Sequence, residues 1–122
     1  MEFQKDQAIY LQIADLICEN ILSGEWAEDE RIPSVRELAM TAEVNPNTVM
    51  RSYTWLQDKG IIQNQRGIGY FVAPGAIEQT RRLKKEEFIN TQIPQLFKMM
   101  ALLNISIDDL KSIYAKQNGG QT

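Results

Sequence analysis

The first stretch of the chain repeats apolar residues at helical spacing. In residues 8–22 the apolar positions that share one side of a helix are Ile9, Ile13, Leu16, Ile17 and Ile21. Spacings of three and four residues predict an amphipathic helix, which Ser23-Gly24 ends. Cys18 lies inside this run and is expected to be a small buried residue. Trp26 follows in a loop and is expected to fold back on the core.

A second helix is predicted to begin at Ser34. The sequence "SVRE" forms a capping box, in which the Ser34 hydroxyl accepts from the Glu37 amide and the Glu37 carboxylate reaches back. This helix is short and is expected to end near Thr41. Its inward positions are Val35, Leu38 and Ala39. Val44, in the tight connection after it, is expected to be buried.

A third helix is predicted to begin in the stretch "EVNPNTVMRSY". Asn45 is a good N-cap, and Pro46 falls at the first helical position, where its missing N–H costs nothing. Gly60 provides the left-handed stop. The inward positions are Val49, Tyr53 and Leu56. Helix, short turn and helix together predict a helix-turn-helix, in which the second of the pair is the recognition helix.

Two short β-rich runs follow the third helix. They are "IIQNQ" and "GYFVA", joined by "RGIG", and they predict a hairpin that forms a wing. Small polar residues crowd the first turn of the third helix, where a buried helix would carry leucine or alanine. Backbone N–H groups and short polar side chains at a helix N-terminus can reach phosphates and base edges. We therefore expect this turn to enter the major groove of DNA.

The remaining residues form a helical tail. Pro74-Gly75 is expected to separate a winged helix-turn-helix domain, residues 1–75, from a tail, residues 76–122. The tail has a helical pattern to about Leu103, which Pro94 should kink or split. Asn104 is expected in the left-handed conformation, before Ser106 caps a last helix. The predicted fold class is mostly α (α+β), a winged helix-turn-helix followed by a short two-helix dimerisation segment.

An apolar stripe runs along this tail, and two helices are too few to enclose a drug-sized pocket and also form their own core. We therefore expect the stripe to pair with the same stripe of a second chain. The alternatives are that the tail packs on its own DNA-binding domain, or that "FKMM" lines a small apolar ligand site between two chains. The expected dimerisation residues are Phe88, Ile93, Leu96, Phe97, Met100, Leu103 and Leu110.

The net charge of −3 at first argues against a nucleic-acid partner, but the charges are unevenly distributed. Residues 1–30 carry eight acids and one base, whereas residues 31–72 carry five bases and three acids. Residues 73–122 carry seven bases and five acids, among them the run "RRLKK". That run is either a solvated face or a secondary contact to flanking phosphates.

Composition excludes several kinds of chemistry. The chain has no histidine and one cysteine, so a structural zinc site, an intrachain disulfide and a histidine-based triad are excluded, and no cofactor is expected. No run approaches the ~20 apolar residues of a membrane span. The polar, acidic N-terminus does not resemble a signal peptide, so we expect a cytoplasmic protein.

The chain resembles the GntR family of bacterial transcription regulators. The resemblance covers about residues 8–73, through "YLQIADLICENILSGEW", "RIPSVRELAMTAEVNPNTVMRSYTWLQDKGII" and "RGIGYFV". The short tail and "VNPNTV" are similar to the YtrA-like subfamily. The resemblance implies a DNA-binding dimer, usually a repressor and often of genes for ABC transporters. Two-fold symmetry would make its operator a palindrome.

The resemblance also suggests DNA-contacting positions. Arg36 matches a family arginine that contacts DNA, and Asn47 and Thr48 match polar contact positions. Ser34 matches a helix-start position near the DNA backbone, and Gly67 matches a wing-tip glycine that approaches the minor groove. By its chemistry, Arg66 is a candidate phosphate or minor-groove contact. The expected DNA-binding residues are Ser34, Arg36, Asn45, Asn47, Thr48, Arg51, Arg66 and Gly67.

The recognition helix departs from the family pattern. Pro46 and Met50 stand where many members carry arginines, and Arg51 lies one residue later, about 100° further around the helix. The operator should therefore differ from those of the arginine-rich members. Arg51 could instead be solvated or ion-paired within its helix, and Asn45 could serve only as a cap.

Two other classes of function compete with this interpretation. One is a winged-helix protein-interaction module that no longer binds DNA, which the overall acidity and the missing arginines favour. The other is an enzyme, for which the chain offers no metal-ligand cluster, nucleophile–base pair or phosphate-binding glycine loop. A small-molecule effector has no support in the sequence.

Overall fold

The computed structural model describes residues 7–119 and divides the chain after Leu83 into two compact units. We call residues 7–83 the first unit and residues 84–119 the second unit. The chain runs, in order, through α1 (Ile9–Leu22), α2 (Val35–Ala42), α3 (Pro46–Asp58), β1 (Ile62–Gln65), β2 (Gly69–Val72), α4 (Ala76–Glu87), the π-helical segment η1 (Phe88–Gln92), α5 (Ile93–Leu102) and α6 (Ile107–Gln117). The sequence placed a domain boundary at Gly75, whereas the compact units divide within α4.

Helix α1 packs on α3 through a face that the apolar pattern only partly predicted. Its buried residues are Gln12, Ile13, Ala14, Ile17, Cys18 and Ile21. The burial expected for Cys18 is confirmed. Ile9 and Leu16, which the pattern placed on the same apolar face, are instead 46% and 36% exposed. Gln12, Ala14 and Cys18 are buried in their place, so the buried strip of α1 lies to one side of the predicted apolar face.

The start of α2 follows its sequence signal. The Ser34 hydroxyl accepts from the Glu37 amide at 3.1 Å, and the Glu37 carboxylate accepts from the Ser34 amide at 3.0 Å, so the predicted capping box is confirmed. After Ala42, Glu43 adopts a left-handed conformation with φ of 57° and turns the chain toward α3. Val44, which was expected to be buried, is only partly buried, and it packs against the core.

Helix α3 is capped by Asn45, whose Oδ1 accepts from the Asn47 amide at 2.8 Å, with Pro46 in the first turn. Its inward residues Val49, Tyr53 and Leu56 are fully buried, as predicted. They meet residues of α1, β1 and β2 in one hydrophobic core, against which Trp26 also packs. The core therefore holds the inner side of α3 and leaves its outer side uncovered.

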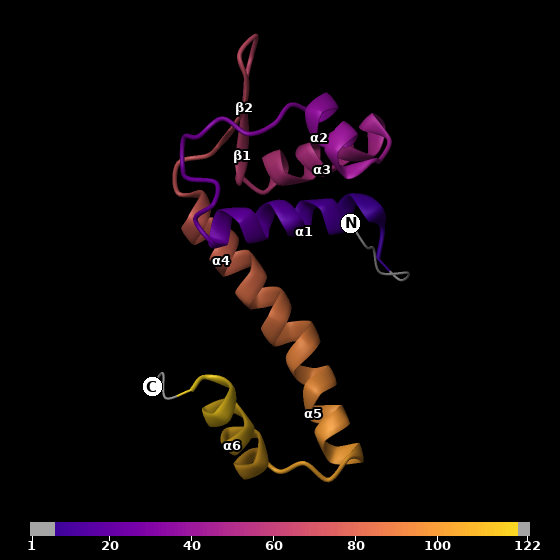
Figure 1. Ribbon diagram of the computed structural model, residues 1–122, viewed down its shortest axis with the longest axis vertical. Coiled ribbons are helices and arrows are strands. Elements are labelled where there is room, and N and C mark those ends of the chain that lie inside the picture. The colour runs from indigo at the N-terminus through magenta and orange to yellow at the C-terminus, as the bar shows by residue number, and fades with distance from the viewer. Residues whose placement is uncertain (1–6, 120–122) are drawn as a thin grey trace. The chain divides into compact units, whose positions relative to one another are not determined.

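The hairpin β1–β2 is antiparallel, with Ile62 opposite Val72 and Gln65 opposite Gly69. The segment before α2 pairs with this hairpin. Arg31 forms an isolated antiparallel β-bridge with Phe71, and the Ile32 amide donates to the Tyr70 carbonyl at 2.9 Å. The tip of the hairpin projects beyond the three helices (Figure 1). The fold predicted from the sequence, a mostly helical winged helix-turn-helix with a two-stranded wing, is confirmed.

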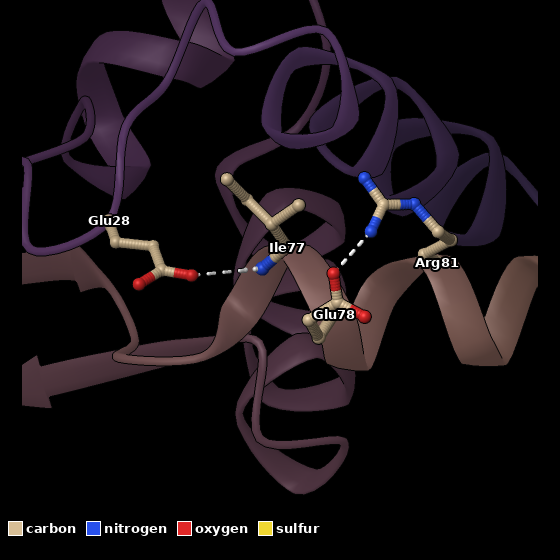
Figure 2. A network of polar contacts seen from close by, with 4 residues as sticks. All are labelled: Glu28, Ile77, Glu78 and Arg81. Carbon is tan, nitrogen blue, oxygen red and sulfur yellow. Dashed lines mark hydrogen bonds and ion pairs between the residues drawn. The ribbon is translucent and has the colours of Figure 1, made fainter.

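The acidic loop after α1 contacts the beginning of α4. The Glu28 carboxylate accepts from the Ile77 amide at 3.4 Å, while Glu78 pairs with Arg81 one turn further along α4 (Figure 2). A carboxylate is favourable there because the first amides of a helix lack intrahelical acceptors and carry partial positive charge. Ala76 and Thr80 are buried, so the first turns of α4 belong to the core of the first unit.

The second unit follows its helix signals, too. Pro94 lies in the first turn of α5, and the turn before it widens so that the Ile93 amide bonds to Phe88 rather than to the residue four earlier. Helical conformation nevertheless continues from Ala76 to Leu102, so the disturbance predicted at Pro94 takes the form of one π-helical turn. A proline lacks the N–H that would continue the α-helical hydrogen-bond ladder. Asn104 has φ of 59°, and Ser106 and Asp109 form a second capping box. In residues 7–119, no helix is long and apolar enough to cross a membrane.

Candidate nucleic-acid interface

The outer side of α3 carries the polar residues that the sequence predicted to meet DNA. Asn47, Met50, Arg51 and Thr54 are exposed, whereas Ser52 and Tyr53 on the opposite side are fully buried. Thr48 is half-buried beside Asn47. This division gives α3 one side anchored in the core and one side available to a partner.

Helix α2 presents Arg36 next to its capping box. Arg36 is exposed, and within residues 7–119 no hydrogen bond or ion pair occupies its guanidinium. The amide and then the hydroxyl of Ser34 hold the pKa of the Glu37 carboxyl below its ordinary value. Glu37 therefore stays ionised near neutral pH and its bonds go to the cap, which leaves the charge of Arg36 available for a partner.

Arg51 is held by a residue outside the helix-turn-helix. Its guanidinium carbon lies 4.1 Å from the centre of the Tyr10 ring, in the first turn of α1. The neighbouring Ser52 hydroxyl donates to the Tyr10 carbonyl at 2.6 Å. Arg51 is exposed, as its solvated alternative expects, and it also lies over an aromatic ring, which the sequence did not predict.

An open groove lies beside the first turn of α3. It is lined by Ala8, Ile9, Tyr10, Asn47, Thr48 and Arg51, and its volume is about 360 Å³. Three expected contact residues thus share one groove with the N-terminus of α1. The sequence pattern of α1 gives no indication of this, because its periodicity marks only the side of the helix that faces the core.

The tip of the wing carries Arg66 and Gly67. Both are exposed, and Arg66 has no polar partner within the described residues. Gly67 has φ of +80°, and a Cβ atom there would meet nothing within 4 Å. The glycine is therefore required by the left-handed backbone and not by crowding.

The wing is fixed to the helices by Tyr70, a residue that the sequence did not single out. Tyr70 of β2 stacks edge-on against Tyr53, with ring centres 4.8 Å apart, and its hydroxyl contacts the Met50 sulfur at 3.8 Å. The Tyr53 hydroxyl in turn donates to the Pro33 carbonyl at 2.6 Å. The Tyr70 ring thus links the wing to both sides of α3.

Arg31 is a further basic residue beside the wing. It is exposed, and its Nε would lie 2.9 Å from a Cβ atom at Gly69. Only glycine lets the guanidinium lie so close to β2. No local pattern pointed to this pair, because Arg31 precedes α2 and Gly69 follows the turn of the wing.

The first unit therefore gathers the eight predicted DNA-binding residues into three places. Ser34 and Arg36 lie at the start of α2, Asn45 caps α3, and Asn47, Thr48 and Arg51 lie on α3. Arg66 and Gly67 lie at the tip of the wing. Within residues 7–119, no group of three or more acidic, cysteine or histidine side chains is placed to hold a metal ion.

Comparison with known proteins gives this arrangement a family. The family described as "Bacterial regulatory proteins, gntR family" matches residues 9–72. The HTH-type transcriptional repressor YtrA of Bacillus subtilis is 34% identical over 117 residues, which cover 93% of this chain and 89% of YtrA. An uncharacterized HTH-type regulator of the same organism, YhcF, is 43% identical over 75 residues, or 62% of each chain.

Solved structures agree over most of the chain. A GntR-family putative transcriptional regulator from Bacteroides thetaiotaomicron is 47% identical with a TM-score of 0.75, covering 94% of this chain and all of its own. The DNA-binding domain of AraR, solved in complex with operator ORR3, is 26% identical with a TM-score of 0.51, covering 60% of this chain and 95% of that domain.

These relatives are transcription regulators and not enzymes, which agrees with the chemistry that the composition excluded. The family match covers the whole helix-turn-helix and wing, and the similarity to YtrA extends through the tail. The chain is therefore a member of the GntR family of DNA-binding transcription regulators, in its YtrA-like subfamily.

Proposed function

We propose that this regulator is a homodimeric repressor that binds a palindromic operator. The observation that carries the proposal is the polar outer side of α3, which stands exposed beside the wing on a core that is complete within one chain. A regulator of this family must contact DNA, and this surface combines the polar first turn of α3 with Arg36 and Arg66, which have no polar partner within the described residues.

In this proposal α3 enters the major groove. Asn47, Thr48 and Arg51 contact base edges and phosphates there, and Asn45 adds a polar side chain beside its capping bond. Ser34 and Arg36 meet the adjacent DNA from the start of α2. Arg66 and Gly67 reach the minor groove from the wing, where an exposed arginine is attracted by the negative potential.

The second unit supplies the dimer contact. Phe88, Leu96, Phe97 and Leu103 are exposed in the single chain, and Ile93 and Leu110 are half-buried. Met100 is only 6% exposed, so it would support this surface from beneath. A stable interface covers roughly 800 Å² per partner, and aromatic and aliphatic side chains usually form its centre.

Repression follows from where such a dimer would sit. A protein that occupies both halves of an operator at a promoter excludes the polymerase. The relative YtrA carries the name of a transcriptional repressor. The resemblance to its subfamily makes genes for an ABC transporter the first candidates for regulation.

Selection of bound duplexes from a random DNA pool, at ~150 mM salt to suppress non-specific binding, tests the proposal. We expect an enriched inverted repeat whose half-sites lie about one helical turn, or a multiple of it, apart. A folded dimer that enriches no sequence would contradict the proposal. It would favour the alternative of a winged helix that contacts another protein.

A further inference from the structure

Two tyrosines from outside the helix-turn-helix lie against the outer side of α3. Tyr70 of β2 contacts Met50, and Tyr10 of α1 lies under Arg51. The second contact involves a charged group, because the Arg51 guanidinium carbon lies 4.1 Å from the centre of the Tyr10 ring. A guanidinium within about 6 Å of an aromatic face is attracted by its quadrupole.

The ring under Arg51 is fixed relative to α3. Ser52 is fully buried, and its hydroxyl donates to the Tyr10 carbonyl at 2.6 Å. Ile13, one turn further along α1, is 1% exposed in the same core as Val49. The backbone that carries Tyr10 is therefore tied to the residue next to Arg51, so the ring forms a fixed platform.

This platform decides where the Arg51 side chain lies. Tyr10 and Arg51 line the open groove together with Asn47 and Thr48. A free arginine side chain samples many rotamers and loses that entropy when it binds. Stacking on a fixed ring removes part of this loss beforehand and keeps the guanidinium, with its five donors, beside the first turn of α3.

We propose that Tyr10 is a positioning residue for operator binding, whose ring holds the Arg51 guanidinium in the groove beside α3 before DNA arrives. The inference rests on the proposed function, because it requires Arg51 to meet the operator. It assigns to the first turn of α1 a role in DNA recognition that lies outside the helix-turn-helix and the wing.

The first test uses the protein without DNA. Ring currents should shift the Arg51 δ-methylene protons upfield in the NMR spectrum. Tyr10→Leu should remove the shift, and Tyr10→Phe should preserve it. Arg51 protons at ordinary positions in the unsubstituted protein would overturn the inference, whatever the operator measurements show.

The second test is a double-mutant cycle in operator affinity, measured on the selected duplex. Tyr10→Leu should weaken binding about two- to fivefold, as expected for the loss of one exposed cation–π contact. In an Arg51→Met background the same change should have no further effect. An equal effect in both backgrounds would show that Tyr10 acts without Arg51 and would overturn the inference.

The conservative variant separates the ring from the hydroxyl. Tyr10→Phe should restore most of the affinity, because it keeps the π face. A loss as large as that of Tyr10→Leu would assign the effect to a direct hydroxyl contact and overturn the positioning role. Thermal unfolding of each variant accompanies the cycle, and Tyr10→Met replaces Tyr10→Leu if the latter melts below the assay temperature. Failure of the unsubstituted protein to bind any duplex would instead overturn the proposed function.

Discussion

The two units of the chain use apolar residues in opposite ways. In the first unit most of them converge on one core, and its centre of Val49, Tyr53, Leu56 and Ile61 is completely buried. In the second unit Met100 is the one buried residue among residues 84–119. Its large exposed apolar residues are Phe88, Ile89, Leu96, Phe97, Met99, Leu102, Leu103, Ile107, Ile113 and Tyr114.

This difference indicates which unit is complete by itself. Burial of apolar surface is the main favourable term in folding, and the first unit achieves it within one chain. The second unit leaves exposed a set of side chains of the kind that marks contact with another protein. The first unit therefore has a surface free for DNA, while the second has a surface that calls for a partner, which we propose to be a second copy.

The largest effect is expected from a charge in the second unit. Leu96→Asp should give monomers, because a carboxylate in an apolar interface loses its hydration. Operator affinity should fall by about a hundredfold or more, since the two recognition helices no longer bind as one molecule. Sedimentation equilibrium measures the mass, and Gln95→Asp, which adds a charge to the adjacent exposed position, is the matched control. A Leu96→Asp dimer of normal affinity would place the interface elsewhere.

A cavity in the first unit should act on stability instead of assembly. Leu56→Ala removes a fully buried side chain and should lower the free energy of unfolding by about 2–5 kcal/mol. Urea denaturation followed by circular dichroism measures this loss. Met40→Ala, at a site that is 80% exposed, should change it by less than about 0.5 kcal/mol. Similar losses for the two variants would refute the assignment of the core.

A smaller effect is expected where the first unit meets DNA. Arg36→Ala should weaken operator binding by about 1–3 kcal/mol if the guanidinium contacts a base, without changing the thermal unfolding of the domain. Fluorescence anisotropy on the selected duplex gives the affinity. Lys98→Ala in the second unit removes the same charge and should leave operator affinity nearly unchanged. If Arg36→Ala binds like the unsubstituted protein, Arg36 does not belong to the interface.

The smallest effect is expected in the stability at acid pH, where the capping boxes of the two units can be compared. Hydrogen bonds from Ser34 lower the pKa of Glu37, and those from Ser106 lower the pKa of Asp109. A carboxyl whose pKa is lowered on folding stabilises the protein above its ordinary pKa, 4.5 for Glu37, and loses this contribution as the pH falls. Melting temperatures should therefore fall less steeply with acidification in Glu37→Gln and in Asp109→Asn. Unchanged acid profiles in both variants would contradict the capping role of the two carboxylates.

Sequence alone predicted the features that local chemistry determines. Caps at Ser34, Asn45 and Ser106 and left-handed stops at Gly60 and Asn104 each depend on side chains a few residues apart. The wing followed from two β-rich runs around glycines. These signals were sufficient for the winged helix-turn-helix because each element begins and ends on its own residues.

The same reasoning could not predict contacts between segments that lie far apart in the chain. Ile9 and Leu16 have helical spacing, yet they are exposed because α3 covers a neighbouring strip of α1. The stacking of Arg51 on Tyr10 and the approach of Arg31 to Gly69 join segments far apart in the chain. A periodic pattern shows that a helix has an apolar side but does not specify which residues of another element will meet it.

The number of chains bound to one operator duplex tests the division of roles between the two units most directly. Sedimentation velocity of the complex, with the selected duplex and a saturating amount of protein, gives its mass. The account predicts two chains per duplex for the unsubstituted protein. A complex that saturates at one chain per duplex would contradict it, because the exposed apolar side chains of the second unit would then serve something other than pairing on DNA.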